Sequence, residues 1–143
     1  MTLVFARTKS LEGIREALDA KRTAVYYRGQ IYGDGQWLRQ IFERSVAITP
    51  QTVTMAGRDR AMLAVENTSA LTYHLVRTSA PAGVDFPGEL TLQSGEIAMF
   101  TVRPSADTLS VSGPVTARYQ VKELITAPGE CAEVPLTITV HIT

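Results

Sequence analysis

Residues that build active sites are scarce in this sequence. Among its 143 residues there are two histidines and one cysteine. A metal centre needs three or four converging ligands, and a nucleophile needs a neighbouring base. We therefore expect no catalytic residue, no metal ligand and no cofactor-binding residue in the chain, which is not a self-sufficient enzyme. A single cysteine also excludes an intramolecular disulfide, so packing alone must hold the fold.

The few residues that could carry chemistry each have a structural interpretation. His74 falls on the face opposite to the apolar side chains of segment 71–77, and His141 shares its face with the threonines of the last strand. We expect both histidines to face outward, with no carboxylate, cysteine or second histidine at ligand spacing. Cys131 lies in a turn flanked by two glutamates, whose charge opposes thiolate formation, and we interpret it as an inert loop thiol.

Excess charge and long apolar runs are absent as well. Fourteen basic and fourteen acidic residues give a formal net charge of zero, which argues against a nucleic-acid partner. No apolar run approaches the length of a membrane span. The start, Met1 to Ala6, is too short for a signal-peptide core, and the charges at Arg7 and Lys9 follow it instead of preceding it. We expect a soluble protein without a membrane partner, and the compartment stays undetermined.

What the sequence does contain begins with an α/β pattern. The apolar run 2–6 predicts a central parallel strand buried on both faces. Ser10 predicts the N-cap of an amphipathic helix at about 11–21, and 23–27 is strand-like again, a βαβ signature. Asp34 predicts the cap of a second helix, Asp34–Glu43. That helix carries four large apolar residues on one stripe: Trp37, Leu38, Ile41 and Phe42.

Two segments offer weak ligand signals. The glycine-rich segment Gly29–Gly35 precedes a helix, but its spacing fits no phosphate-binding loop, and Asp34 would repel a phosphate, so we interpret it as a turn. Arg118, Gln120 and Lys122 alternate on one strand face. With Tyr26, Tyr27 and Arg28 they could form a ligand surface, although a solvated sheet face is the more common arrangement.

From Ser45 onward the pattern is that of β-structure. The sequence predicts strands at 45–49, 52–56, 60–66, 71–77, 87–93, 96–103, 108–112, 115–124 and 134–142, separated by turn residues such as those at 113–114 and 128–129. Alternating apolar residues would line a core between two sheets. The fold class is therefore mainly β: a segment 1–44 of βαβα type, followed by an immunoglobulin-like antiparallel β-sandwich at 45–143.

One phrase resembles a known family. Ser10, Glu12, Ile14, the run from Glu16 to Leu18, Ala20 and the pair Arg22-Thr23 follow the pattern S-x-E-x-I-x-E-A-L-x-A-x-R-T. This pattern is similar to the last strand–helix–strand unit of PHP-domain (polymerase and histidinol phosphatase) phosphoesterases that carry a C-terminal β-sandwich. Helix Asp34–Glu43 resembles the connector in that group. Segments 124–129 and 135–140 resemble its final hairpin.

The resemblance implies that this chain is the C-terminal part of such an enzyme. The metal-binding barrel, its divalent metals and any export signal would then lie upstream, and Met1 would be an internal methionine. None of the family's metal ligands has a counterpart here. We expect the stripe Trp37, Leu38, Ile41 and Phe42 to dock on the sandwich, to meet the missing barrel, or to drive self-association. The predicted function is a non-catalytic accessory domain. The alternatives are a stand-alone binding module for carbohydrate or protein and, least favoured, an independent enzyme.

Overall fold

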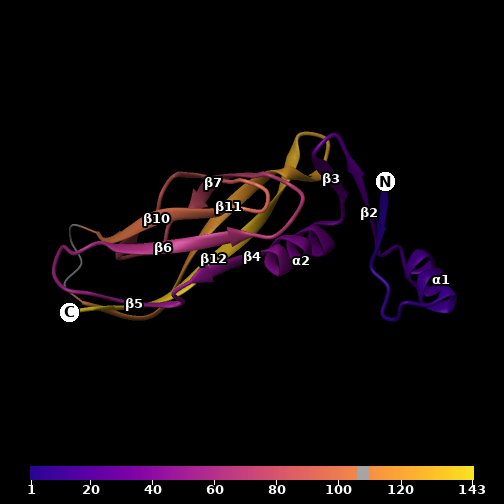
Figure 1. The fold of residues 1–143 in the computed structure, drawn as a ribbon. Coiled ribbons are helices and arrows are strands. Elements are labelled where there is room, and N and C mark those ends of the chain that lie inside the picture. Colours follow the sequence, from indigo (N-terminus) through magenta and orange to yellow (C-terminus); the bar gives the residue numbers. More distant parts are fainter. Residues whose placement is uncertain (106–109) are drawn as a thin grey trace.

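A computed structural model describes residues 1–105 and 110–143, and it arranges them in two facing sheets with helices at one end (Figure 1). The first sheet has eight strands, in the order β1-β2-β3-β11-β12-β5, with β7 pairing on β11 and β9 pairing on β7. The second has the order β4-β6-β10-β8. The elements are β1 (Thr2–Val4), α1 (Leu11–Asp19), β2 (Thr23–Tyr27), β3 (Gln30–Gly33), α2 (Gly35–Ser45), β4 (Val46–Thr49), β5 (Thr52–Met55), β6 (Ala61–Asn67), β7 (Tyr73–Ser79), β8 (Val84–Asp85), β9 (Glu89–Leu92), β10 (Ile97–Pro104), β11 (Val111–Ala127) and β12 (Glu130–Ile142).

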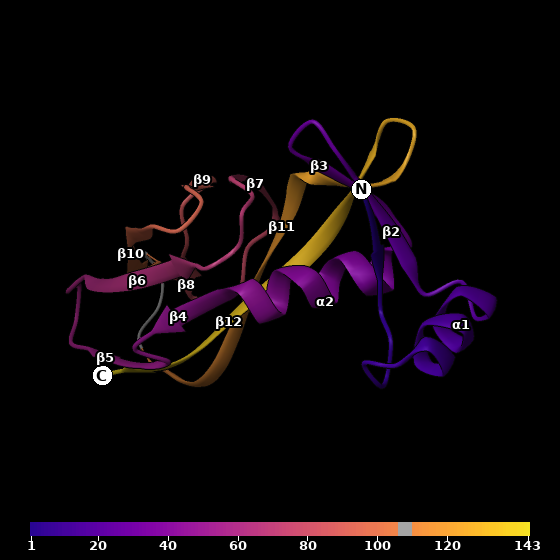
Figure 2. The same ribbon diagram turned by 45° about the vertical axis from the view of Figure 1, so that its right-hand side comes forward.

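The two helices begin where the sequence predicts. The Ser10 side chain accepts a hydrogen bond from the backbone N–H of Gly13, and Asp34 accepts one from that of Gln36. Helix α1 stands away from the rest of the molecule beyond β2 (Figure 2), whereas α2 lies along β11 and β12. Neither helix among the described residues is long and apolar enough to cross a membrane.

The predicted central parallel strand at 2–6 is wrong. Strand β1 is short, pairs antiparallel with β2 and forms the edge of the sheet, where its residues are exposed or half-buried. The glycine-rich segment is also more than a turn, because Gln30–Gly33 forms β3. Arg28 and Gly29 both have positive φ angles, 51° and 78°, which is the backbone of a tight hairpin between β2 and β3. Strand β3 then pairs in parallel with β11, which joins the first 45 residues to the sandwich sheet.

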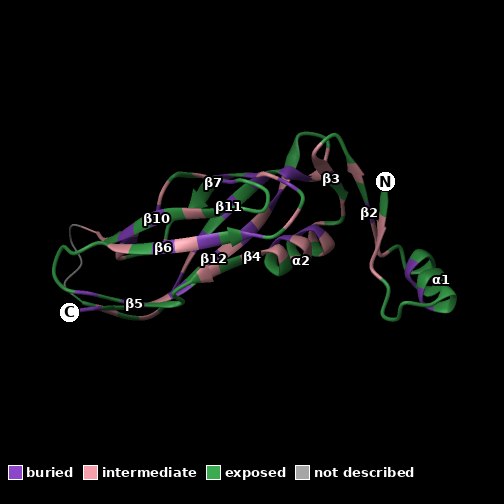
Figure 3. Cartoon of the chain, viewed as in Figure 1, coloured by how far each residue is buried: buried purple, intermediate pink, exposed green. Residues whose placement is uncertain are grey.

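The core between the sheets follows the predicted alternation. Leu63 and Val65 of β6 and Tyr119 and Val121 of β11 are all buried in one apolar cluster. Ala117 of β11 joins them, and the main members from the other strands are Phe100, Val102, Ile138, Val140 and Ile142. Figure 3 shows buried stretches along both facing sheets. The sandwich is thus held by apolar packing, as the absence of a disulfide requires.

Strand β11 corrects another boundary. The sequence predicts a break at 113–114, but Gly113 and Pro114 lie inside a 17-residue strand paired with β12. Proline is tolerated there because no described strand pairs with the other edge of β11 at this position. The start of the predicted strand 108–112 lies outside the described residues, and its end belongs to β11.

Asn67, at the end of β6, is completely buried and holds a loop in place. Its side-chain amide donates to the carbonyl oxygens of Leu71 (2.7 Å) and Leu92 (2.9 Å). Its side-chain oxygen accepts from the backbone N–H of Ser69 at 3.0 Å and from the Ser69 hydroxyl at 2.7 Å. All four hydrogen-bonding positions of the amide are used, as burial of such a group demands.

Candidate functional site

The histidines, the cysteine and the basic strand face singled out from the sequence lie on three different strands, β7, β11 and β12. Among residues 1–105 and 110–143, no group of three or more histidine, cysteine, aspartate or glutamate residues could hold a metal ion. His141 is exposed and its Nδ1 lies 2.9 Å from the Ser112 hydroxyl. Cys131 is half-buried and its sulfur lies 3.9 Å from the carbonyl oxygen of Lys122. Arg118, Gln120 and Lys122 are all exposed, and Arg118 pairs with Glu133 at 3.6 Å.

His74 does have a carboxylate neighbour, contrary to the expectation from sequence spacing. Its ring Nδ1 contacts Glu123 Oε1, and its backbone N–H donates to both oxygens of that carboxylate at 2.9 and 3.0 Å. Glu123 is buried, whereas the His74 side chain is 55% exposed. The sequence could have predicted the burial of Glu123, because this residue continues the inward alternation of Ala117, Tyr119 and Val121. One histidine and one carboxylate are too few ligands for a metal site, and the contact fixes β7 to β11.

The stripe on α2 divides into two faces. Leu38 and Phe42 point into the core, where Phe42 packs on Tyr73 with ring centroids 5.3 Å apart. Docking on the sandwich, one of the expected outcomes, is therefore observed for these two residues. Trp37 and Ile41 are only half-buried and face the segment after β1, although Ile41 also packs against the margin of the core.

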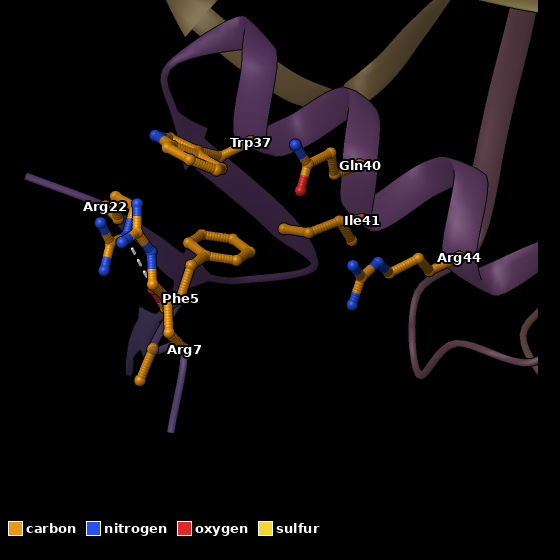
Figure 4. A pocket seen from close by; sticks show the side chains of 8 residues that line it. Phe5, Arg7, Arg22, Trp37, Gln40, Ile41 and Arg44 are labelled. Carbon is orange, nitrogen blue, oxygen red and sulfur yellow. Dashed lines mark hydrogen bonds between the residues drawn. The ribbon is translucent and has the colours of Figure 1, made fainter. Parts of the chain in front are cut away.

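Trp37 and Ile41 form one wall of a hollow of about 490 Å³ (Figure 4). Its apolar part is built on a stacked pair, Phe5 against Trp37, with ring centroids 5.4 Å apart at an interplanar angle of 19°. The segment after β1 thus faces α2 across the hollow. The lining residues are Phe5, Ala6, Arg7, Arg22, Trp37, Gln40, Ile41 and Arg44.

The rim of the hollow is basic. Three of its eight lining residues are arginines, and none is acidic. Arg22 is already engaged, since its Nε donates to the Phe5 carbonyl oxygen at 3.0 Å and its two terminal nitrogens bind the carboxylate of Glu16. The hydrogen bond from Arg22 lowers the pKa of Glu16, and the same bond raises the pKa of Arg22. Arg7 and Arg44 are both exposed, so the hollow presents an apolar floor between two available cations.

A second exposed feature lies on the β2–β3 hairpin. Tyr27 and Tyr32 are 56% and 38% exposed, and Val25, which pairs with Tyr32, is exposed beside them. The Arg28 guanidinium lies 5.2 Å from the centre of the Tyr27 ring. Tyr26, by contrast, is half-buried against the core, so only one of the two adjacent tyrosines is available at the surface.

Two facing sheets with one apolar core define an immunoglobulin-like β-sandwich. A family model described as an Ig-like domain matches residues 46–137, well over half of the 143 residues. The chain therefore belongs to this Ig-like domain family. The match leaves out residues 1–45, which include every residue that lines the hollow.

A solved structure is similar to almost the whole chain, including residues outside the Ig-like match. The chain is similar to a crystal structure of a two-domain protein from Bacteroides vulgatus ATCC 8482, described as containing a predicted PHP-like metal-dependent phosphoesterase. The TM-score is 0.80 and the identity 26%, over 96% of this chain but only 38% of that protein. A C. elegans MSP family member, WR4, is similar at a TM-score of 0.46 and 11% identity, over 68% of this chain and 95% of that one. No curated protein matches the chain.

Proposed function

We propose that this chain is a non-catalytic accessory domain of a PHP-type, metal-dependent phosphoesterase. One observation carries the proposal: almost the whole chain, including residues outside the Ig-like match, follows part of a two-domain protein described with such an enzyme. The PHP-like phrase at residues 10–23 supports the same assignment. In this proposal the division is at residues 44 and 45, with 1–44 facing the catalytic domain and 45–143 bracing it.

The described residues give the accessory role a physical basis. A phosphoesterase centre needs several carboxylates and histidines around its metals, and the described part of the chain brings together no such set. What it offers instead is a rigid sandwich joined to the first 45 residues by the β3–β11 pairing and by buried Leu38 and Phe42. The metals and the reaction belong, in this proposal, to the preceding domain.

The genomic sequence upstream of the Met1 codon tests this proposal. We expect the same reading frame to encode a domain rich in histidine and aspartate. A stop codon shortly upstream, with no such domain in frame, would remove the main support. As a biochemical arm, the purified 143-residue chain is incubated with bis(4-nitrophenyl) phosphate and Mn²⁺ or Zn²⁺. Hydrolysis that persists after repurification would show that the chain is itself an enzyme.

The exposed tyrosines favour a second candidate, a stand-alone binding module. Tyr27 and Tyr32 lie on one hairpin face, and exposed aromatic rings of this kind bind sugar rings or partner proteins by stacking. A glycan array probed with the wild-type chain and with Tyr27→Ala/Tyr32→Ala tests it. Binding that the double substitution abolishes would support this candidate, and an array without signal would count against carbohydrate.

A further inference from the structure

We infer that the hollow formed by Phe5, Trp37, Ile41, Arg7 and Arg44 is the docking seat for the phosphoesterase domain of the same protein. The inference rests on the proposed function and names the surface through which the accessory domain contacts the phosphoesterase domain. The expected occupant is an apolar side chain flanked by carboxylates, inserted between the exposed arginines Arg7 and Arg44.

The composition of the hollow is that of an interface centre. Tryptophan and arginine are enriched where partner proteins contribute most binding energy, and a half-buried Trp37 on a Phe5 support offers a pre-formed apolar surface. Arg7 and Arg44 give the rim a positive potential, because Glu16 does not line the hollow, pairs with Arg22 and offsets only part of the charge of Arg7. The complementary surface must therefore be apolar at its centre and acidic around it.

A small phosphate fits this geometry less well. Tight binding of one phosphate needs donors that converge on one point. Here the guanidinium of Arg22 is occupied by Glu16 and by the Phe5 carbonyl oxygen. The remaining two arginines come from different elements, Arg7 after β1 and Arg44 near the end of α2, with the apolar floor between them. Two separated cations around an apolar floor match a peptide segment better than a single anion.

The identity of the partner follows from the comparisons. All lining residues precede residue 46 and lie outside the Ig-like match, so the sandwich family does not account for the hollow. They lie within the part that follows the two-domain B. vulgatus protein, and 62% of that protein is not covered by this chain. The uncovered part is where we place the phosphoesterase domain.

Hydroxyl-radical footprinting of the complete two-domain protein and of the 143-residue chain, read by mass spectrometry at Trp37, tests the inference. Met62, 62% exposed on the sandwich, serves as an internal reference. We expect Trp37 oxidation to be about fivefold slower or more in the two-domain protein, as for a residue at an interface core. Arg7→Glu/Arg44→Glu should restore the rate of the isolated chain. The matched control Arg15→Glu/Arg39→Glu, which changes exposed arginines of α1 and α2 outside the hollow, should not.

Three results would overturn the inference. One is equal Trp37 oxidation in the chain and in the two-domain protein, and another is an equal response to both double substitutions. The third is a Trp37 oxidation rate in the isolated chain that falls as its concentration rises, which would identify a second copy as the occupant. The proposed function fails separately, through the genomic test, if no phosphoesterase domain precedes the chain.

Discussion

Replacing Asn67 by alanine is expected to cost several times more stability than replacing an exposed polar residue of the sandwich. The side chain makes four hydrogen bonds inside the protein, two as donor and two as acceptor. Alanine leaves the carbonyl oxygens of Leu71 and Leu92 and the amide of Ser69 without these partners. At about 1 kcal/mol for each lost interaction, the free energy of unfolding should fall by about 3–4 kcal/mol. For a chain of this size the melting temperature should fall by roughly 10 °C.

Urea unfolding followed by far-UV circular dichroism measures the loss. Thr68→Ala is the matched control, because the Thr68 hydroxyl donates to Ser45 O at an exposed site and should contribute less than about 1 kcal/mol. Asn67→Asp keeps the acceptor but places a charge against two carbonyl oxygens. It should be less stable than Asn67→Ala at pH 7 and recover as the pH falls. A loss below about 1 kcal/mol for Asn67→Ala would refute the reasoning, because it would mean that the loop satisfies its own backbone groups.

Three further predictions concern other parts of the molecule. Burial raises the pKa of Tyr119 to about 12, above its ordinary value near 10, so this residue's contribution to stability is complete below pH 10 and is lost as the pH rises toward 12. Tyr119→Phe should therefore reduce the loss of unfolding free energy at alkaline pH by up to about 2 kcal/mol, and an unchanged pH dependence would contradict the assignment. Phe42→Ala should lower the free energy of unfolding by about 3–5 kcal/mol in urea titrations, and a change as small as that of an exposed residue would show that α2 does not brace the sandwich. Gly13→Ala places a Cβ against the hydroxyl and carbonyl of Thr8, so amide exchange in α1 should accelerate while that of β11 does not; equal exchange in α1 would show that the loop before it yields easily.

Local signals in the sequence predicted the local features of the fold. Ser10 and Asp34 cap their helices because their side-chain oxygens reach free backbone amides within three residues. The period-two alternation placed residues such as Leu63 and Tyr119 in the core, and the same rule, extended by one step, would have placed Glu123 there too. These features depend on neighbours along the chain, which is why a sequence shows them.

Features that depend on distant neighbours were missed. Strand β3 was missed because its glycine, Gly33, indicated a turn. The glycine suits this position because a Cβ added there would lie 3.1 Å from the Cβ of Ala24 on the paired strand. Pro114 indicated a turn because proline cannot donate a backbone hydrogen bond within a sheet. Only the sheet order shows that the edge of β11 opposite to β12 is unpaired at this position. The hollow joins segments 5–7, 22 and 37–44, and no spacing in the sequence relates an arginine after β1 to a tryptophan on α2.

Strand β11 has a mechanical consequence for the whole protein. One edge of it carries β7 and then β3, while the other carries β12, so a single strand of 17 residues, about 55 Å if fully extended, runs through both ends of the molecule. The two chain ends lie at opposite ends of that axis (Figure 1). Tension between them would load the β11–β12 ladder in shear, so that many hydrogen bonds must break together. A partner that binds the first 45 residues therefore also fixes the position and orientation of the sandwich, because no flexible linker separates the two parts.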